Sequence, residues 1–94
     1  MEVNTFKVMN ISTVHITDWD YICLKEEVLE KSPLVYDVDY GFLLFVGDGD
    51  LGLDNLSRAL RNIIIIAFEN DCLWIMIDQD GTVYDELPTY NWED

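Results

Sequence analysis

The segment that decides the fold runs from Cys72 to Trp92 and reads CLWIMIDQDGTVYDELPTYNW. It begins with an apolar run, residues 72–77, of a composition typical of a buried strand. This run ends at the sequence DQDG, residues 78–81, whose Asp-Gly pair is a strong signal for a tight turn. Beyond the turn, we expect residues 82–84 to fold back as a short partner strand, which makes a C-terminal hairpin arm.

The first third of the chain predicts one strand and one helix. Residues 1–9 are expected to form an edge strand or an arm. Residues 11–16 alternate and are rich in β-branched side chains, so they predict the first strand. Thr17 can cap a helix that continues to about residue 31, where a Ser-Pro pair ends it.

The middle of the chain predicts two strands, residues 34–37 and 41–46, followed by a helix over about residues 55–69. The apolar residues of this helix recur at helical spacing, and Asn70 is expected to close it in the left-handed conformation. The chain therefore predicts a single α+β domain, residues 1–94. Two helices cover one face of an antiparallel sheet in ferredoxin-like (split βαβ) order, with the C-terminal hairpin arm added. The other face keeps apolar side chains that need a cover.

Net charge is the most unusual property of the composition. Nineteen acidic residues stand against five basic ones, which gives a formal net charge of -14. Such a surplus argues against direct binding to nucleic acid or to an anionic membrane, because both are polyanions. It favours a basic protein partner, a cation, or solubility alone.

Neither the apolar segments nor the cysteines indicate a secreted or membrane-spanning chain. The longest apolar block, residues 63–68, is far shorter than the roughly 20 residues that cross a bilayer, and the N-terminal residues lack a secretory pattern. Cys23 and Cys72 lack zinc-site spacing and are expected to be reduced, although the spacing also permits a disulfide between them. We therefore expect a cytoplasmic protein.

Candidate chemical motifs are few. The sequence around Asp78 and Asp80 is similar to the first motif of haloacid-dehalogenase-type phosphatases, where these positions would be the nucleophile and the general acid/base. The later Lys of that family has no counterpart after Asp80. The loop from Asp48 to Asp54 is acidic but lacks the Gly and Glu of a calcium loop, so weak cation binding is the alternative to a solvated loop. His15 is expected to be structural. We predict no catalytic residue, no metal site and no cofactor.

Acidic residues interleaved with aromatic residues are the strongest functional signal. Aromatic side chains among charges are typical of the residues that dominate protein interfaces. An acidic surface of this kind could occupy the cationic groove of a nucleic-acid-binding protein. The predicted partner-binding residues are Asp18, Trp19, Asp20, Glu26, Glu30, Asp37, Asp39, Asp85, Glu86, Tyr90 and Trp92.

Three motifs carry a resemblance to a known family: ISTVHIT at residues 11–17, YGF at 40–42, and DG followed by DELPTYNW at 80–92. The chain resembles an uncharacterised family of small domains from bacteria, phages and plasmids that end in a DELPTYxW-type motif. The resemblance implies an origin on or near mobile elements. Small acidic proteins from that setting often resemble inhibitors of host defence, including CRISPR and restriction inhibitors.

The leading hypothesis is a non-enzymatic, acidic protein-binding domain. It would inhibit a basic host defence protein that binds nucleic acid, as an anti-CRISPR or anti-restriction protein, by DNA mimicry or steric blocking. The alternative is a structural or accessory domain that forms a homodimer through its open sheet face.

Overall fold

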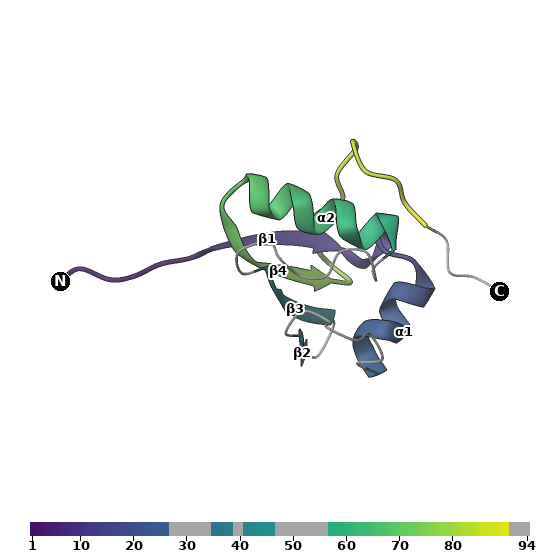
Figure 1. The fold of residues 1–94 in the computed structure, drawn as a ribbon, viewed down its shortest axis with the longest axis horizontal. Helices are drawn as coiled ribbons and strands as arrows, with labels where there is room; N and C mark the ends of the chain where they lie inside the picture. Colours follow the sequence, from purple (N-terminus) through teal and green to yellow (C-terminus); the bar gives the residue numbers. More distant parts are fainter. Residues whose placement is uncertain (27–34, 39–40, 47–56, 91–94) are drawn as a thin grey trace.

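A computed structural model of the chain describes residues 1–26, 35–38, 41–46 and 57–90. In the described part, four strands form one sheet in the order β1-β4-β3-β2 (Figure 1). The strands are β1 (Lys7–Ser12), β2 (Val35–Val38), β3 (Gly41–Phe45) and β4 (Cys72–Asp78). The helices are α1 (Asp18–Glu26) and α2 (Arg58–Glu69), and a short 3-10 turn, η1 (Thr13–His15), follows β1.

The order of elements along the chain is the predicted one, and the α+β class is confirmed. The spatial order is not ferredoxin-like. That order would place β1 between β4 and β3 in a fully antiparallel sheet, whereas β1 here lies at the edge and runs parallel to β4. The sheet is therefore mixed, with β3 antiparallel to both of its neighbours.

The composition of β1 and β4 explains why β4, and not β1, lies in the interior of the sheet. In β4, Ile75 and Ile77 are fully buried on one face, and Trp74 and Met76 are half-buried on the other, so the strand suits the interior of the sheet. In β1, Lys7 and Asn10 are exposed. A strand with charged and amide side chains suits a sheet edge, where such groups discourage unwanted pairing.

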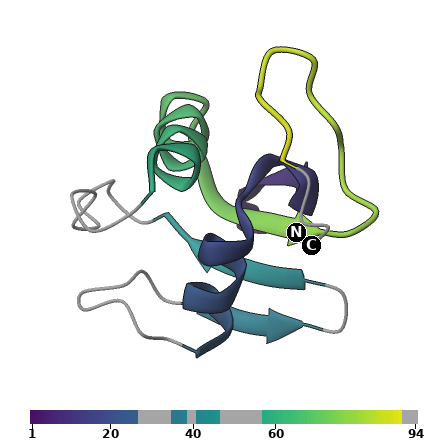
Figure 2. The same ribbon diagram turned by 90° about the vertical axis from the view of Figure 1, so that its right-hand side faces the viewer.

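One continuous hydrophobic core joins both helices to the same face of the sheet (Figure 2). Tyr21 of α1 meets Phe42 of β3 edge-on, with ring centroids 5.2 Å apart. Each fully buried aliphatic or aromatic side chain contributes about 1.5–3 kcal/mol relative to exposure. The core consists of Met9, Ile11, Ile16, Leu24, Phe42, Leu44, Val46, Leu60, Ile63, Ile64, Ala67, Ile75 and Ile77.

The opposite face of the sheet is less well covered. Val8 is 48% exposed, and Leu43, Phe45, Trp74 and Met76 are half-buried. The rings of Phe45 and Trp74 meet edge-on at 4.8 Å. This group of five residues is called the open sheet face below.

The first strand begins and ends earlier than predicted. It covers Lys7–Ser12 instead of residues 11–16, because the chain turns at Ser12, whose hydroxyl accepts a hydrogen bond from Val14 N (3.2 Å). The end of the first predicted helix and the Asp48–Asp54 loop lie outside the described residues. Over the part of the chain that the structure describes, neither helix is long or apolar enough to cross a bilayer.

The turn from α2 to β4 contains a residue in the left-handed conformation. It is Asp71, with φ of 60°, whereas the sequence predicted Asn70, whose φ is -100°. Aspartate tolerates this region better than most residues but less well than glycine.

We therefore expect Asp71→Gly to raise the free energy of unfolding by up to about 1 kcal/mol. The Asp71 side chain is exposed, so its loss removes no buried contact. Asp71→Ala is the matched variant, and it should lower stability because Cβ strain remains without the tolerance of aspartate. Urea denaturation checks both changes, and equal stability of the two variants would contradict the argument.

Candidate protein-interaction site

The segment after β4 crosses to the C-terminal end of β1 instead of folding back on β4. Ser12 N donates to Thr82 O (2.8 Å), and Tyr90 N donates to Val14 O (2.8 Å). Residues 82–84 are not a strand, so the predicted hairpin arm is absent from the described residues. The reason is a better set of partners at β1: the side-chain oxygen of Asn10 accepts from both Thr82 N (2.8 Å) and Thr82 Oγ1 (3.0 Å).

His15 connects the two parts of this arrangement. Its Nε2 accepts a hydrogen bond from Tyr84 N, and its Nδ1 lies against Pro88 O, both at 2.8 Å. An amide N–H can only donate and a carbonyl can only accept, so these two contacts match the tautomer in which Nδ1 is the donor and Nε2 the acceptor. His15 is 2% exposed, so its ring connects the two segments from inside the fold. We call residues 12–15 and 82–90, held together by this ring, the His15 junction.

The DQDG turn leads the chain into the junction. Asp78 Oδ1 accepts from Asp80 N (2.8 Å), and Gly81 N donates to Asp78 O (3.0 Å). A Cβ atom on Gly81 would overlap the backbone carbonyl of Ile11. Asp78 thus serves a tight turn that needs glycine for close approach, and this geometry favours the turn interpretation over the phosphatase resemblance. No group of three potential ligands (His, Cys, Asp or Glu) that could hold a metal ion occurs among the described residues.

A buried carboxylate joins the beginnings of the two helices. Asp20 is fully buried; its Oδ2 accepts from Thr17 N (3.1 Å) and from Ser57 Oγ (2.8 Å). Thr17 Oγ1 accepts from Asp20 N in return, which completes a reciprocal helix cap. Ser57 caps α2 through Leu60 N (3.1 Å). The negative charge lies at the positive end of α1, which partly offsets its burial.

A sequence model described as "Family of unknown function (DUF5983) C-terminal domain" matches residues 8–92. The chain belongs to this family. No curated protein and no solved structure matches it. The match extends from β1 through the His15 junction, so all three motifs quoted for the resemblance lie inside this DUF5983 domain.

Five of the predicted partner-binding residues of the DUF5983 domain lie in or beside the junction. Asp18 is exposed and Trp19 is 51% exposed at the start of α1, three and four residues after His15. Asp85 and Glu86 are exposed in the turn closed by Leu87 N and Tyr84 O, and Tyr90 is half-buried. We call Asp18, Trp19, Asp85, Glu86 and Tyr90 the junction surface.

The other predicted residues divide into one correction and several untested positions. Asp20 is fully buried between the beginnings of α1 and α2, so it cannot serve as a surface acid. Glu26 ends α1, and Asp37 lies opposite Phe42 in the β2–β3 register. Glu30, Asp39 and Trp92 lie outside the described residues. Cys23 and Cys72 are not joined by a disulfide; Cys23 is buried and Cys72 is half-buried.

Sequence reasoning missed the residues that build the junction. His15 was expected to be structural, but not to bind residues 69 and 73 positions away. Asn10 was not singled out, and Tyr84 was expected in a short partner strand, whereas its hydroxyl donates to Asn10 O (2.7 Å). The available signal was the joint presence of ISTVHIT and DELPTY among the resemblance motifs, which the structure brings into contact.

Proposed function

We propose that this domain acts by binding a basic protein through its junction surface, without catalysing a reaction. The observation that carries the proposal is the exposure of Asp18, Trp19, Asp85 and Glu86 on two segments that the His15 ring joins. A half-exposed tryptophan beside carboxylates has the composition of an interface centre.

The hydrogen bonds of the junction also support the proposal. The backbone around Asp85 and Glu86 is held by hydrogen bonds from Tyr84 N and to Pro88 O, one on each side of the two acids. A loop that is ordered before binding loses less conformational entropy when a partner docks. The net charge of -14 adds long-range attraction toward a cationic surface and speeds encounter.

In its specific form, the proposal is inhibition of a host defence protein that binds nucleic acid, of the anti-CRISPR or anti-restriction type. The domain would occupy the cationic groove as a DNA mimic or block it sterically. The charge surplus supports this form, because a surface that binds a polyanion also attracts a folded acidic protein and releases counterions in the process.

The test compares two variants that each remove surface acids from different ends of the domain. In the first, Asp18→Asn, Asp85→Asn and Glu86→Gln are combined at the junction surface. In the second, Glu69→Gln and Asp71→Asn change exposed acids at the far end of α2. We expect the first variant to bind a captured basic protein at least about tenfold more weakly, and the second to bind nearly as well as the unchanged chain.

The capture uses a bacterial host lysate at low and high salt, and duplex DNA is then added as a competitor. DNA mimicry predicts release by DNA and weaker capture at high salt. Capture that is indifferent to salt, or equal loss in the two variants, would remove the junction surface as the binding site.

The alternative function, a structural domain that dimerises through the open sheet face, has its own supporting observation. Val8 is 48% exposed, and the half-buried rings of Phe45 and Trp74 lie side by side on that face. Light scattering distinguishes the two functions, because a tight dimer without a basic partner favours the alternative. The experiment at the end of the next subsection separates this dimer from one made elsewhere on the domain.

A further inference from the structure

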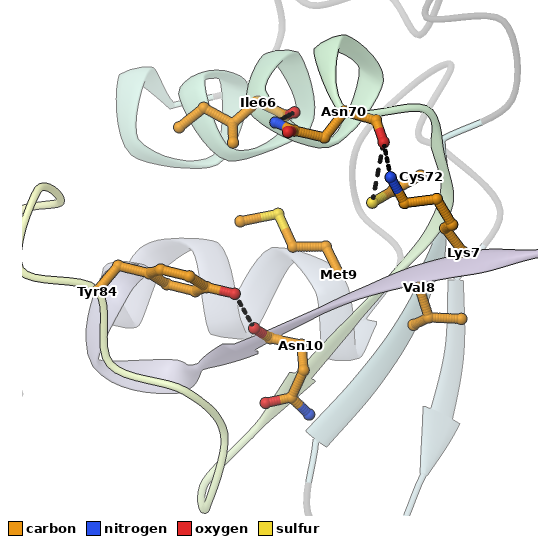
Figure 3. A pocket seen from close by; sticks show the side chains of 8 residues that line it. All are labelled: Lys7, Val8, Met9, Asn10, Ile66, Asn70, Cys72 and Tyr84. Carbon is orange, nitrogen blue, oxygen red and sulfur yellow. Dashed lines mark hydrogen bonds between the residues drawn. The ribbon is translucent and has the colours of Figure 1, made fainter.

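A groove of about 460 Å³ lies between the outer edge of β1 and the C-terminal half of α2 (Figure 3). Hydrogen bonds mark its two ends: Lys7 Nζ donates to Asn70 O (2.7 Å), and the Tyr84 hydroxyl donates to Asn10 O (2.7 Å). Apolar side chains lie between these ends. The lining residues that matter here are Met9, Ile66 and Cys72.

The strand beside the groove has an outer edge that can pair with another strand. β1 lies at one edge of the described sheet, and β2 lies at the other. On this outer side, Asn10 O accepts from the Tyr84 hydroxyl and Ser12 N donates to Thr82 O. Alternation along the strand directs the N–H and C=O of Val8 to the same outer side. An open edge beside an apolar groove is the arrangement in which an extended segment adds as a further strand.

The same chain carries an extended segment of suitable length. Residues 1–6 continue directly from β1 and extend away from the sheet (Figure 1). All six are exposed, and two of them are large apolar residues, Val3 at 66% and Phe6 at 67% exposure. Six residues in strand conformation span about 20 Å, which is long enough to run past the outward groups of Val8 on a neighbouring β1.

Charge distribution identifies a second copy of the chain as an acceptable partner at this edge. Residues 1–17 contain one acid, Glu2, and one Lys or Arg, Lys7, so the whole surplus of -14 lies in residues 18–94. Two copies that meet through their arms and β1 edges therefore join their neutral parts. Contacts through most other surfaces would bring like charges together.

We propose that two copies of this chain form a dimer by exchanging arms. Each arm, residues 1–6, pairs antiparallel with the outer edge of the partner copy's β1. Side chains alternate between the two faces of a strand, so Val3 enters the groove on the Met9 side and Phe6 lies on the opposite face, beside the partner copy's Val8. Because arm and edge belong to one continuous strand, the same contact is made twice about a two-fold axis, which closes the assembly at two copies.

The experiment measures the mass of the full chain by light scattering across a range of concentrations at low and high salt. We expect a dimer that strengthens with salt, since screening reduces repulsion between the acidic bodies. Val3→Ser combined with Phe6→Ser should raise the dimer dissociation constant at least about tenfold, because both apolar anchors are lost. Removal of residues 2–6 should give a monomer with an unchanged circular dichroism spectrum.

Two control variants test the location of the contact. Ile22→Ser removes an apolar side chain that is 50% exposed on α1, away from the groove, and it should leave the dimer intact. Met76→Lys places a charge on the open sheet face and should also leave it intact. A monomer at every concentration and salt, or a dimer lost in Met76→Lys and kept without the arm, would overturn arm exchange. Either result leaves the junction-surface proposal standing, since its binding weakens with salt and requires different residues.

Discussion

His15→Ala should lower the free energy of unfolding by about 3 kcal/mol and release residues 82–90 from the rest of the domain. The substitution leaves Tyr84 N–H and Pro88 C=O without their partners. Each partly buried group that loses its hydrogen bond costs about 1–3 kcal/mol, and the volume of the buried imidazole adds a cavity term.

Urea unfolding gives the stability change, and amide hydrogen exchange gives its location. We expect exchange to accelerate at Tyr84, Leu87 and Tyr90, whose N–H groups are bonded in the native fold, and to change less at Ile75 in the sheet. His15→Asn retains a donor close to the Nδ1 position and should recover part of the loss.

Val83→Ala provides the control for this result, because Val83 lies in the same segment and is 57% exposed. Its effect should stay within about 0.5 kcal/mol. If His15→Ala and Val83→Ala had the same stability and the same exchange pattern, the ring would not hold the junction together.

Gly41→Ala is expected to cost about 3 kcal/mol or more. Gly41 begins β3 and lies opposite Asp78 of β4. A Cβ atom there would overlap the carbonyl oxygen of Ile77 and lie only 2.8 Å from its carbonyl carbon and 3.0 Å from Asp78 Cα. All three obstructing atoms belong to backbone, so the two strands must separate, and overpacking of this kind commonly costs 1–3 kcal/mol with larger values known.

Denaturation of Gly41→Ala should show a lower midpoint, and Leu43→Ala on the same strand serves as the comparison. Leu43 is half-buried and its truncation leaves the spacing of β3 and β4 unchanged, so a smaller loss is expected. A Gly41→Ala midpoint equal to that of the unchanged chain would show that the sheet yields easily at this position.

The elements could be predicted because their signals are local. The apolar spacing of α2, the cap at Thr17 and the apolar run of β4 each lie within a few residues, and each was found in place. Strand order depends on whether β1 or β4 buries more apolar surface when it lies in the centre of the sheet. Lys7 and Asn10 are polar, whereas β4 has apolar side chains on both faces. This difference indicates the strand order, but only when the alternative strand pairings are compared.

The site was harder to predict because its contacts join distant segments. The Asp-Gly pair correctly indicated a turn. The path of the chain after this turn depends on hydrogen bonds of Thr82 and Tyr84 with Asn10, which lies about 70 positions earlier in the sequence. The burial of Asp20 had a visible signal, since Thr17 and Asp20 have the spacing of a reciprocal cap. Charge alone could not separate that acid from the exposed Asp18.

The parallel pairing of β1 with β4 bears on how the domain is completed during synthesis. The sheet neighbour of β1 is made only after about sixty further residues have left the ribosome, and the partners of His15 follow later still. The N-terminal strand must wait without its sheet neighbour while the helices, β2 and β3 are made. A chain that stops short of Pro88 would lack the contact of its carbonyl with His15, so the His15 junction closes only after residues 82–90 have been made.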